Sequence, residues 1–205
     1  MSTEITVFVV DDDRAVRDSL ALLVQSVGLE VETFAGAQDF LDAYRPERRG
    51  CLITDLRMPD MSGLDLQERL SADRYHIPVI VLTGFGDVPA AVRALKGGAI
   101  DFVEKPFNPQ ALLDLVHQAI ALDGEQRERA ARDSERAERM ALLTRREQDV
   151  MALVVAGKAN KVIAMDLQIS ERTVELHRGR IMKKMRVRSL AELVQIVLPP
   201  SVDVV

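Results

Sequence analysis

Five side chains suited to phosphoryl transfer follow short apolar runs in the first half of the sequence. Asp11 and Asp12 come directly after the run 5–10, and Asp55 after 51–54, while Thr83 closes 78–83 and Lys105 lies just beyond 100–103. Three carboxylates without a nearby thiol or imidazole form an oxygen-rich site that suits Mg²⁺, or another divalent cation such as Mn²⁺. A cation there would also offset the repulsion between adjacent aspartates.

This set of residues can form an aspartyl phosphate. We expect Asp55 to be the nucleophile, with Mg²⁺ and Lys105 neutralising the charge that develops on the phosphoryl oxygens. The Thr83 hydroxyl would donate a hydrogen bond to the phosphoryl group, and Arg57 would offer its backbone carbonyl to the metal.

Simpler interpretations apply to some of these residues. Asp11 to Asp13, taken alone, would be a turn and a helix cap, and Asp13 fits an N-cap better than a metal ligand. Phe102 is suited to the core, and Cys51 reads as a small buried hydrophobe.

The apolar runs alternate with amphipathic segments, which predicts an α/β domain. We expect strands over 5–10, 30–34, 51–54, 78–83 and 100–103, and helices over 13–27, 37–44, 63–72, 88–96 and 109–122. Ser62 and Asn108 are helix-start signals. This order predicts a doubly wound, five-stranded parallel sheet, in which ligands bind beyond the carboxyl ends of the strands.

The second half of the sequence lacks strand patterns. Residues 123–140 are mostly charged, with acid-before-base pairs such as Glu135–Arg139, and are expected to form a solvated, partly frayed helical linker. Helices are then expected over 145–156, 161–167, 171–184 and 190–197. The predicted organisation is a domain over 1–122, a linker over 123–140, an all-α four-helix domain over 141–198 and a tail over 199–205.

Charge separates the two predicted domains. The chain of 205 residues has a net charge of −5, but residues 1–122 carry −8 and residues 141–198 carry +5. The basic domain therefore suits nucleic acid. No apolar run approaches a membrane span, no signal pattern precedes the first strand, and the single cysteine excludes an internal disulfide framework. We expect a cytoplasmic protein.

The segments 161–167 and 171–184 have the spacing of a helix-turn-helix, with Ser170 as N-cap of the longer helix. Its side away from the core carries residues that could enter a major groove, and others nearby suit phosphate. The groove candidates are Arg172, Glu175, Leu176, Gly179, Arg180 and Lys183, and the phosphate candidates are Lys161, Thr173, His177 and Lys184. Arg172 and Lys183 suit guanine or phosphate, and Glu175 suits cytosine.

The motifs "VVDDD", "CLITDLRMPDMSGLDL", "VIVLTGFGDV" and "AIDFVEKPF" resemble the receiver domain of two-component response regulators over roughly residues 4–122. The resemblance implies the sheet order 2-1-3-4-5 and Mg²⁺ held by Asp11, Asp12 and Asp55. It implies phosphorylation at Asp55, an essential Lys105, and switch residues Thr83 and Phe102. It also implies a cis bond between Lys105 and Pro106.

The motifs "LTRREQDVM", "GKANKVIAMDL", "ISERTVELHRGRIMKKM" and "VRSLAELV" resemble the LuxR-type DNA-binding domain. Glu175 departs from the pattern, because relatives often carry a basic residue there. The resemblance implies that the last helix forms a dimer contact on a two-fold DNA site through Leu190, Leu193, Val194 and Val197. The same helix could equally be simple core.

Together the two halves resemble a response regulator of the NarL/FixJ type, in its FixJ/StyR branch. That resemblance implies a phosphoryl group received from a sensor histidine kinase, homodimerisation, binding to double-stranded promoter DNA, and activation of transcription with RNA polymerase. Two alternatives stay open: a phosphate-blind DNA-binding dimer, and a Mg²⁺-dependent phosphotransferase or phosphatase. We also expect Phe85 and Arg57 to shield the aspartyl phosphate from water, which would slow its decay.

Overall fold

The computed structural model describes residues 4–84 and 88–198 and forms two compact units, Met1–Glu128 and Arg129–Val205. The first unit contains the predicted parallel sheet. Its strands are β1 (Ile5–Val10), β2 (Glu30–Phe34), β3 (Arg49–Asp55), β4 (Val79–Thr83) and β5 (Asp101–Glu104), in the order β2-β1-β3-β4-β5. This order confirms the expected topology. The pairings β1–β2, β1–β3, β3–β4 and β4–β5 are parallel, so the carboxyl ends of the strands meet at one edge.

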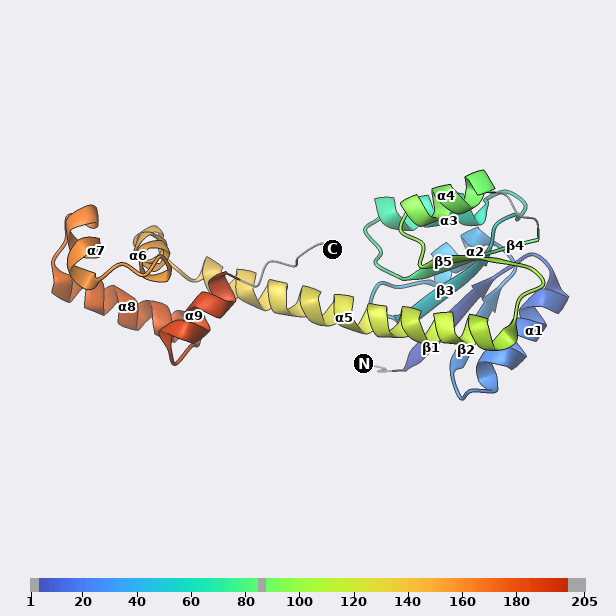
Figure 1. The fold of residues 1–205 in the computed structure, drawn as a ribbon, viewed down its shortest axis with the longest axis horizontal. Coiled ribbons are helices and arrows are strands. Elements are labelled where there is room, and N and C mark those ends of the chain that lie inside the picture. The colour runs from blue at the N-terminus through green and yellow to red at the C-terminus, as the bar shows by residue number, and fades with distance from the viewer. Residues whose placement is uncertain (1–3, 85–87, 199–205) are drawn as a thin grey trace. The chain divides into compact units, whose positions relative to one another are not determined.

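Helices cover both faces of this sheet, as Figure 1 shows. On one face lie α2 (Ala37–Ala43), α3 (Gly63–Ala72) and α4 (Val88–Lys96). The other face is covered by α1 (Arg14–Gln25) and the first half of α5 (Pro109–Ala141). Strands buried on both faces must be apolar almost throughout, which explains runs such as 5–10 and 79–83.

Local capping explains where two of these helices begin. Asp13 is the N-cap of α1, because its Oδ1 accepts a hydrogen bond from the Ala15 N–H at 2.8 Å. Ser62 and Asp65 form a reciprocal capping box at the start of α3. Both caps confirm the expectations from the sequence, and each supplies partners for N–H groups that the first helical turn leaves unpaired.

Helix α5 is one continuous helix over residues that the sequence divides into a domain helix and a linker. Its apolar side packs on the sheet through Leu112, Val116 and Ala119. The next inward-facing residue is Asp123, which is only 2% exposed. Residues 123–128, placed at the start of the linker by the sequence, thus lie in the first compact unit.

Asp123 belongs to a buried polar cluster. Its carboxylate accepts hydrogen bonds from Arg127 Nε at 2.7 Å and from the Gly50 N–H at 3.2 Å. The guanidinium of Arg127 also donates to the carbonyls of Pro46 and Arg48, at 2.8 and 2.6 Å. A buried charge is tolerated only when it is paired and hydrogen-bonded, and here both partners meet that condition. The cluster fixes this turn of α5 to the segment that precedes β3.

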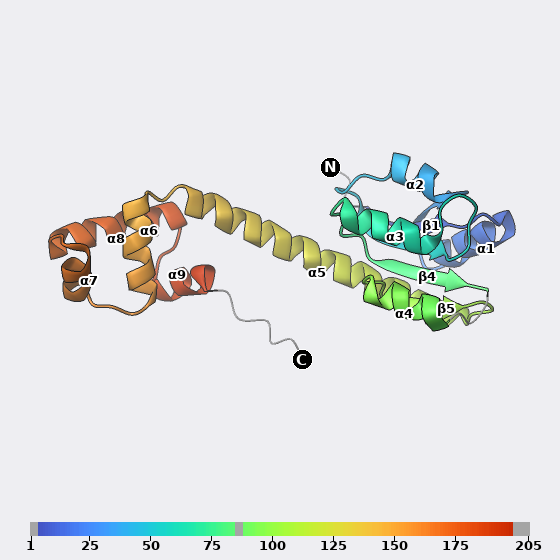
Figure 2. The same cartoon turned by 90° about the horizontal axis from the view of Figure 1, so that it is seen from above.

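The second unit is all-helical, with α6 (Arg145–Val155), α7 (Asn160–Leu167), α8 (Glu171–Met185) and α9 (Leu190–Val197) around one core (Figure 2). Core residues include Val150, Ile163, Val174, Ile181 and Met185. The end of α5 joins this unit, where Met140 packs on the core and Arg139 donates to the Met185 carbonyl. No helix among the described residues is long and apolar enough to span a bilayer.

We predict that Arg127→Ala lowers the free energy of unfolding of the first unit by about 2–3 kcal/mol, because it leaves the buried Asp123 carboxylate without its cation. Denaturant unfolding of the full chain, with hydrogen exchange on the strand amides, measures the change. The matched control is Arg129→Ala, two residues further along at an exposed position. Equal stability of the two variants would contradict a structural role for the buried pair.

Candidate functional site

The residues expected to carry chemistry converge at the carboxyl edge of the sheet. Asp11 directly follows β1, Asp55 ends β3, Thr83 ends β4, and Lys105 directly follows β5. The order β1-β3-β4-β5 places these strand ends side by side. Residues separated by as many as 94 positions are thereby brought into hydrogen-bonding contact.

The Lys105 ammonium lies between two carboxylates at this edge. Its Nζ is 2.7 Å from Asp11 Oδ2 and 2.6 Å from Asp55 Oδ1. The other oxygen of Asp55 accepts a hydrogen bond from the Arg57 N–H at 2.7 Å. Both aspartates are buried, so the single lysine offsets two negative charges in a poorly solvated place. The bond between Lys105 and Pro106 is cis, as expected.

Titration of the pocket follows from burial and from these contacts. Burial raises the pKa of Asp11 above its ordinary value, and the hydrogen bonds from Lys105 and the Asp13 N–H offset that effect only in part. Burial opposes the positive charge of Lys105, but the bonds to Asp11 and Asp55 outweigh it, and the pKa of Lys105 is raised. Lys105 therefore stays protonated well above neutral pH, and the pocket keeps this positive charge.

The oxygen donors at this edge of the sheet are of the kind that binds Mg²⁺. Asp11 and Asp55 offer carboxylate oxygens, Asp12 is exposed beside Asp11, and Arg57 contributes backbone at the same edge. Oxygen donors with access to water are what Mg²⁺ prefers. Among the described residues no three acidic, histidine or cysteine side chains gather closely enough to enclose a metal ion.

The switch candidates Thr83 and Phe102 lie on the strands that the sequence predicts for them. Thr83 is buried at the end of β4, and Phe102, in β5, is partly buried against the core on the α2–α4 face. Phe85, expected to shield the phosphate, lies outside the described residues. Cys51 is fully buried, and burial raises the pKa of its thiol to about 12, which confirms its interpretation as a small hydrophobe.

In the second unit, α7 and α8 form the expected helix-turn-helix. Gln168 ends α7 in the left-handed conformation, and two residues later Ser170 caps α8 by accepting from the Thr173 N–H at 3.1 Å. The Thr173 hydroxyl lies 2.8 Å from the Ser170 hydroxyl, so it already takes part in the cap.

The outer side of α8 is exposed as predicted. The exposed residues are Arg172, Glu175, Leu176, Gly179, Arg180 and Lys183, and Lys161 of α7 is exposed as well. His177 is half-buried, and its Nδ1 is a buried nitrogen without a hydrogen-bond partner in the described part of the chain.

Lys184 differs from its expected role as a phosphate contact. Its Nζ is 2.6 Å from Oε2 of Glu147, a buried residue that also closes a capping box with Thr144 at the start of α6. The ammonium therefore ties α8 to α6 inside the unit. The hydrogen bond from Lys184, followed by the bonds from Thr144, holds the pKa of Glu147 down at about 2.

The residues expected at a dimer contact on α9 divide into two groups. Leu190 is exposed, whereas Leu193 is 1% exposed and lies in the core, where it is unavailable to a second chain. Val194 is half-buried, and Val197 packs partly on the same core. Core packing thus explains much of the apolar stripe on this helix.

Two features were not anticipated from the sequence. Helix α4 exposes Val88, Val92 and Leu95, spaced four and three residues apart on one side, while Ala90 and Ala94 face inward. The helical period of residues 88–96 was visible, but which side faces solvent depends on α3 and the sheet. The second feature is the ion pair between the buried Glu147 and Lys184, for which the sequence carries no signal.

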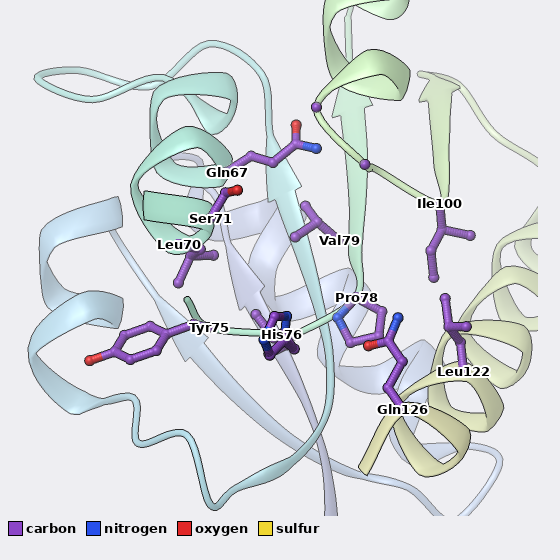
Figure 3. Close-up of a pocket in the computed structure, with 13 residues that line it drawn as sticks. Gln67, Leu70, Ser71, Tyr75, His76, Pro78, Val79, Ile100, Leu122 and Gln126 are labelled. Carbon is purple, nitrogen blue, oxygen red and sulfur yellow. The ribbon is translucent and has the colours of Figure 1, made fainter. Parts of the chain in front are cut away.

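A hollow of about 190 Å³ opens at the amino-terminal edge of the sheet, opposite the carboxylates (Figure 3). It lies between α3, the residues preceding β4 and β5, and α5. Its lining includes Gln67, Ser71, His76, Pro78, Val79 and Gln126, and contains no aspartate, glutamate, lysine or arginine.

Two protein families match the chain. Residues 7–117 match the response regulator receiver domain, and residues 141–197 match the bacterial regulatory proteins of the luxR family. The transcriptional regulatory protein FixJ of Azorhizobium caulinodans is 48% identical over 97% of this chain and 94% of its own length. Nodulation protein W of Bradyrhizobium diazoefficiens is 47% identical over 95% of this chain and 86% of its own length.

Solved structures agree with these matches. The response regulator StyR is 49% identical, with a TM-score of 0.86 over 95% of this chain and 98% of the solved chain. Full-length FixJ from B. japonicum is 42% identical, with a TM-score of 0.60 over 96% of this chain and 97% of the solved chain.

We predict that Glu147 makes the stability of the second unit depend on acid. Because its pKa falls from an ordinary 4.5 to about 2 in the folded chain, its stabilising effect is complete above pH 4.5 and disappears as the pH falls toward 2. At pH 7 we expect Glu147→Gln to lose about 3 kcal/mol, and the difference from wild type should shrink below pH 4.5.

Hydrogen exchange on the α8 amides between pH 7 and pH 3.5 reports the stability of this unit. Asp149→Asn, an exposed neighbour on α6, serves as the control. A deficit in Glu147→Gln that stays constant across this pH range would show that the charge of Glu147 contributes nothing.

Proposed function

The chain belongs to the response regulators that join a receiver domain to a LuxR-type DNA-binding domain, and on this premise we propose that phosphorylation of Asp55 controls its binding to promoter DNA. It is a transcriptional regulator. The observation that supports the phosphorylation step best is the Lys105 ammonium held between Asp11 and Asp55 at the open edge of the sheet.

In the proposed reaction an Asp55 oxygen attacks the phosphorus of a phosphohistidine on a sensor kinase. The new O–P bond forms as the N–P bond breaks, and the electron pair of that bond stays on the imidazole nitrogen. Asp11, Asp12, Asp55 and the Arg57 carbonyl would hold Mg²⁺, which when bound supplies positive charge to the phosphoryl oxygens. Lys105 contributes a second fixed positive charge beside Asp55.

The proposed switch runs from the pocket to the surface of α4. Thr83 would move toward the phosphoryl group, and Phe102 would turn into the space vacated behind it, which would change the α4 and β5 surface. The exposed side chains of Val88, Val92 and Leu95 support a homodimer at that surface, because an apolar stripe on a charged domain favours a partner.

We propose that the dimer binds a two-fold promoter site with one α8 helix in each half-site. Arg172, Glu175, Gly179, Arg180 and Lys183 would face the groove, with Lys161, Thr173 and His177 near phosphates. Lys184 can serve phosphate only by releasing Glu147. On α9, Leu190, Val194 and Val197 remain candidates for contact between the two bound chains. Cytoplasmic location and activation through RNA polymerase complete the proposal.

Gly179 supports contact with DNA because nothing within the unit explains it. A Cβ at this position would meet no atom within 4 Å, and its backbone is ordinary helix. Glycine in the middle of a helix costs about 0.5–1 kcal/mol relative to alanine. A helix that must approach base edges closely gains from a position without a side chain. Contact with DNA would therefore explain why this helix accepts the stability that Gly179 costs it.

Two other functions are less well supported. A phosphotransferase that turns over small substrates would need a second acid or base beside Asp55, but Leu56 and Arg57 follow it. We therefore propose that the chain catalyses only its own phosphorylation and dephosphorylation. If the chain were a DNA-binding dimer that does not respond to phosphate, the contacts of Lys105 with Asp11 and Asp55 would serve no function.

We predict that acetyl phosphate with Mg²⁺ raises the affinity of the wild-type chain by about tenfold or more for duplexes that it enriches from a random-sequence library. Asp55→Asn should lose this gain, because a carboxamide is a poor nucleophile. Asp60→Asn, an exposed change close by, should keep it. Equal DNA binding by wild type and Asp55→Asn, with and without the donor, would instead favour the phosphate-blind dimer.

We predict that Gly179→Ala changes stability and DNA binding in opposite directions. The second unit should gain about 0.5–1 kcal/mol, while affinity for the enriched duplex falls severalfold as the added methyl group holds the helix away from the bases. Thermal unfolding and DNA titration measure the two effects, with Gln195→Ala on α9 as a control. Unchanged affinity in a stabilised variant would remove Gly179 from the DNA interface.

A further inference from the structure

The outer side of α8 combines unpaired charges with one large apolar side chain. Arg172, Glu175, Arg180 and Lys183 are exposed, and none of their side chains forms a hydrogen bond or ion pair with any residue in 4–84 or 88–198. Other charged groups of the unit do form ion pairs, as in Lys158–Asp166 and Lys184–Glu147. The unpaired groups on α8 are therefore available to an external partner.

Leu176 lies among these charges and is 54% exposed. The inner side of α8 supplies Val174, Ile181 and Met185 to the core, and Leu176 is not part of that core cluster. A single exposed leucine on a protein surface is ordinary. The position of this one is not, because it follows Arg172 by one helical turn and precedes the bare backbone of Gly179 by three residues.

Of the four bases, only thymine presents an apolar group, its 5-methyl, to the major groove. Leucine has no donor or acceptor, so placing it against any other base edge would remove water from polar atoms without replacing their hydrogen bonds. A leucine in the groove is consequently selective both by attraction to the methyl group and by the cost at other bases.

We propose that Leu176 is a specificity-determining residue that packs on the 5-methyl group of a thymine in each half-site of the operator. This inference rests on the proposed DNA-binding function of α8 and adds the chemical identity of one base that it reads. The bare backbone at Gly179 gives the base edge room beside the leucine.

The test replaces thymines one at a time with deoxyuridine, which lacks only the 5-methyl group and keeps the same pairing. The DNA is the duplex that the phosphorylated full-length chain enriches from a random-sequence library. At one thymine in each half-site, deoxyuridine should weaken wild-type binding about fourfold, as expected for one lost methyl contact. In Leu176→Ala the same replacement should have no effect.

Leu142→Ala is a matched control. Leu142 is 58% exposed in the same unit but lies outside α8, so this variant should keep the wild-type response to deoxyuridine. Circular dichroism confirms that both variants fold, which their exposed positions lead us to expect.

Two results would overturn the inference and leave DNA binding intact. One is a wild-type chain that binds the enriched duplex equally well with deoxyuridine at every thymine position. The other is a Leu176→Ala variant that retains the full wild-type penalty. Failure of the phosphorylated wild-type chain to enrich any sequence would reject the proposed DNA-binding function itself, and the inference with it.

Discussion

The contact of one ammonium group with two buried carboxylates is the constraint around which the first unit is organised. Lys105 approaches both Asp11 and Asp55 only because β1, β3 and β5 end at the same edge of a parallel sheet. Two carboxylates in a poorly solvated place repel each other and lose hydration, so the arrangement depends on the cation between them. It also leaves a charge imbalance that a divalent cation and a phosphoryl group would redistribute.

Each of the two units contains a buried ion pair that joins two of its elements. At the amino-terminal side of the sheet, Asp123 and Arg127 join α5 to the start of β3 and to the segment before it. In the second unit, Glu147 and Lys184 join α6 to α8, which removes one basic group from the surface that would meet DNA. A fully paired buried charge contributes little net stability, but it fixes one arrangement, since removing either partner is costly.

Much of this molecule could be predicted from its sequence because the signals are local. The bounds of β1, β2, α3, α4 and α9 follow from apolar periodicity, and the caps at Asp13, Ser62 and Ser170 follow from residue type. The convergence of Asp11, Asp55, Thr83 and Lys105 follows from parallel strands. The roles of Asp123, Lys184 and Leu193 could not be predicted, because burial of a side chain at a helical position is decided by the neighbouring elements.

We propose that Asp55 accepts a phosphoryl group in a pocket whose carboxylates require a divalent cation. Mass spectrometry of the intact and digested chain, after treatment with acetyl phosphate and either Mg²⁺ or a chelator, tests this most directly. We expect a single phosphoryl group, located on Asp55, that forms with Mg²⁺ and is absent with the chelator. Phosphorylation of equal extent without the metal, or on another residue, would contradict it.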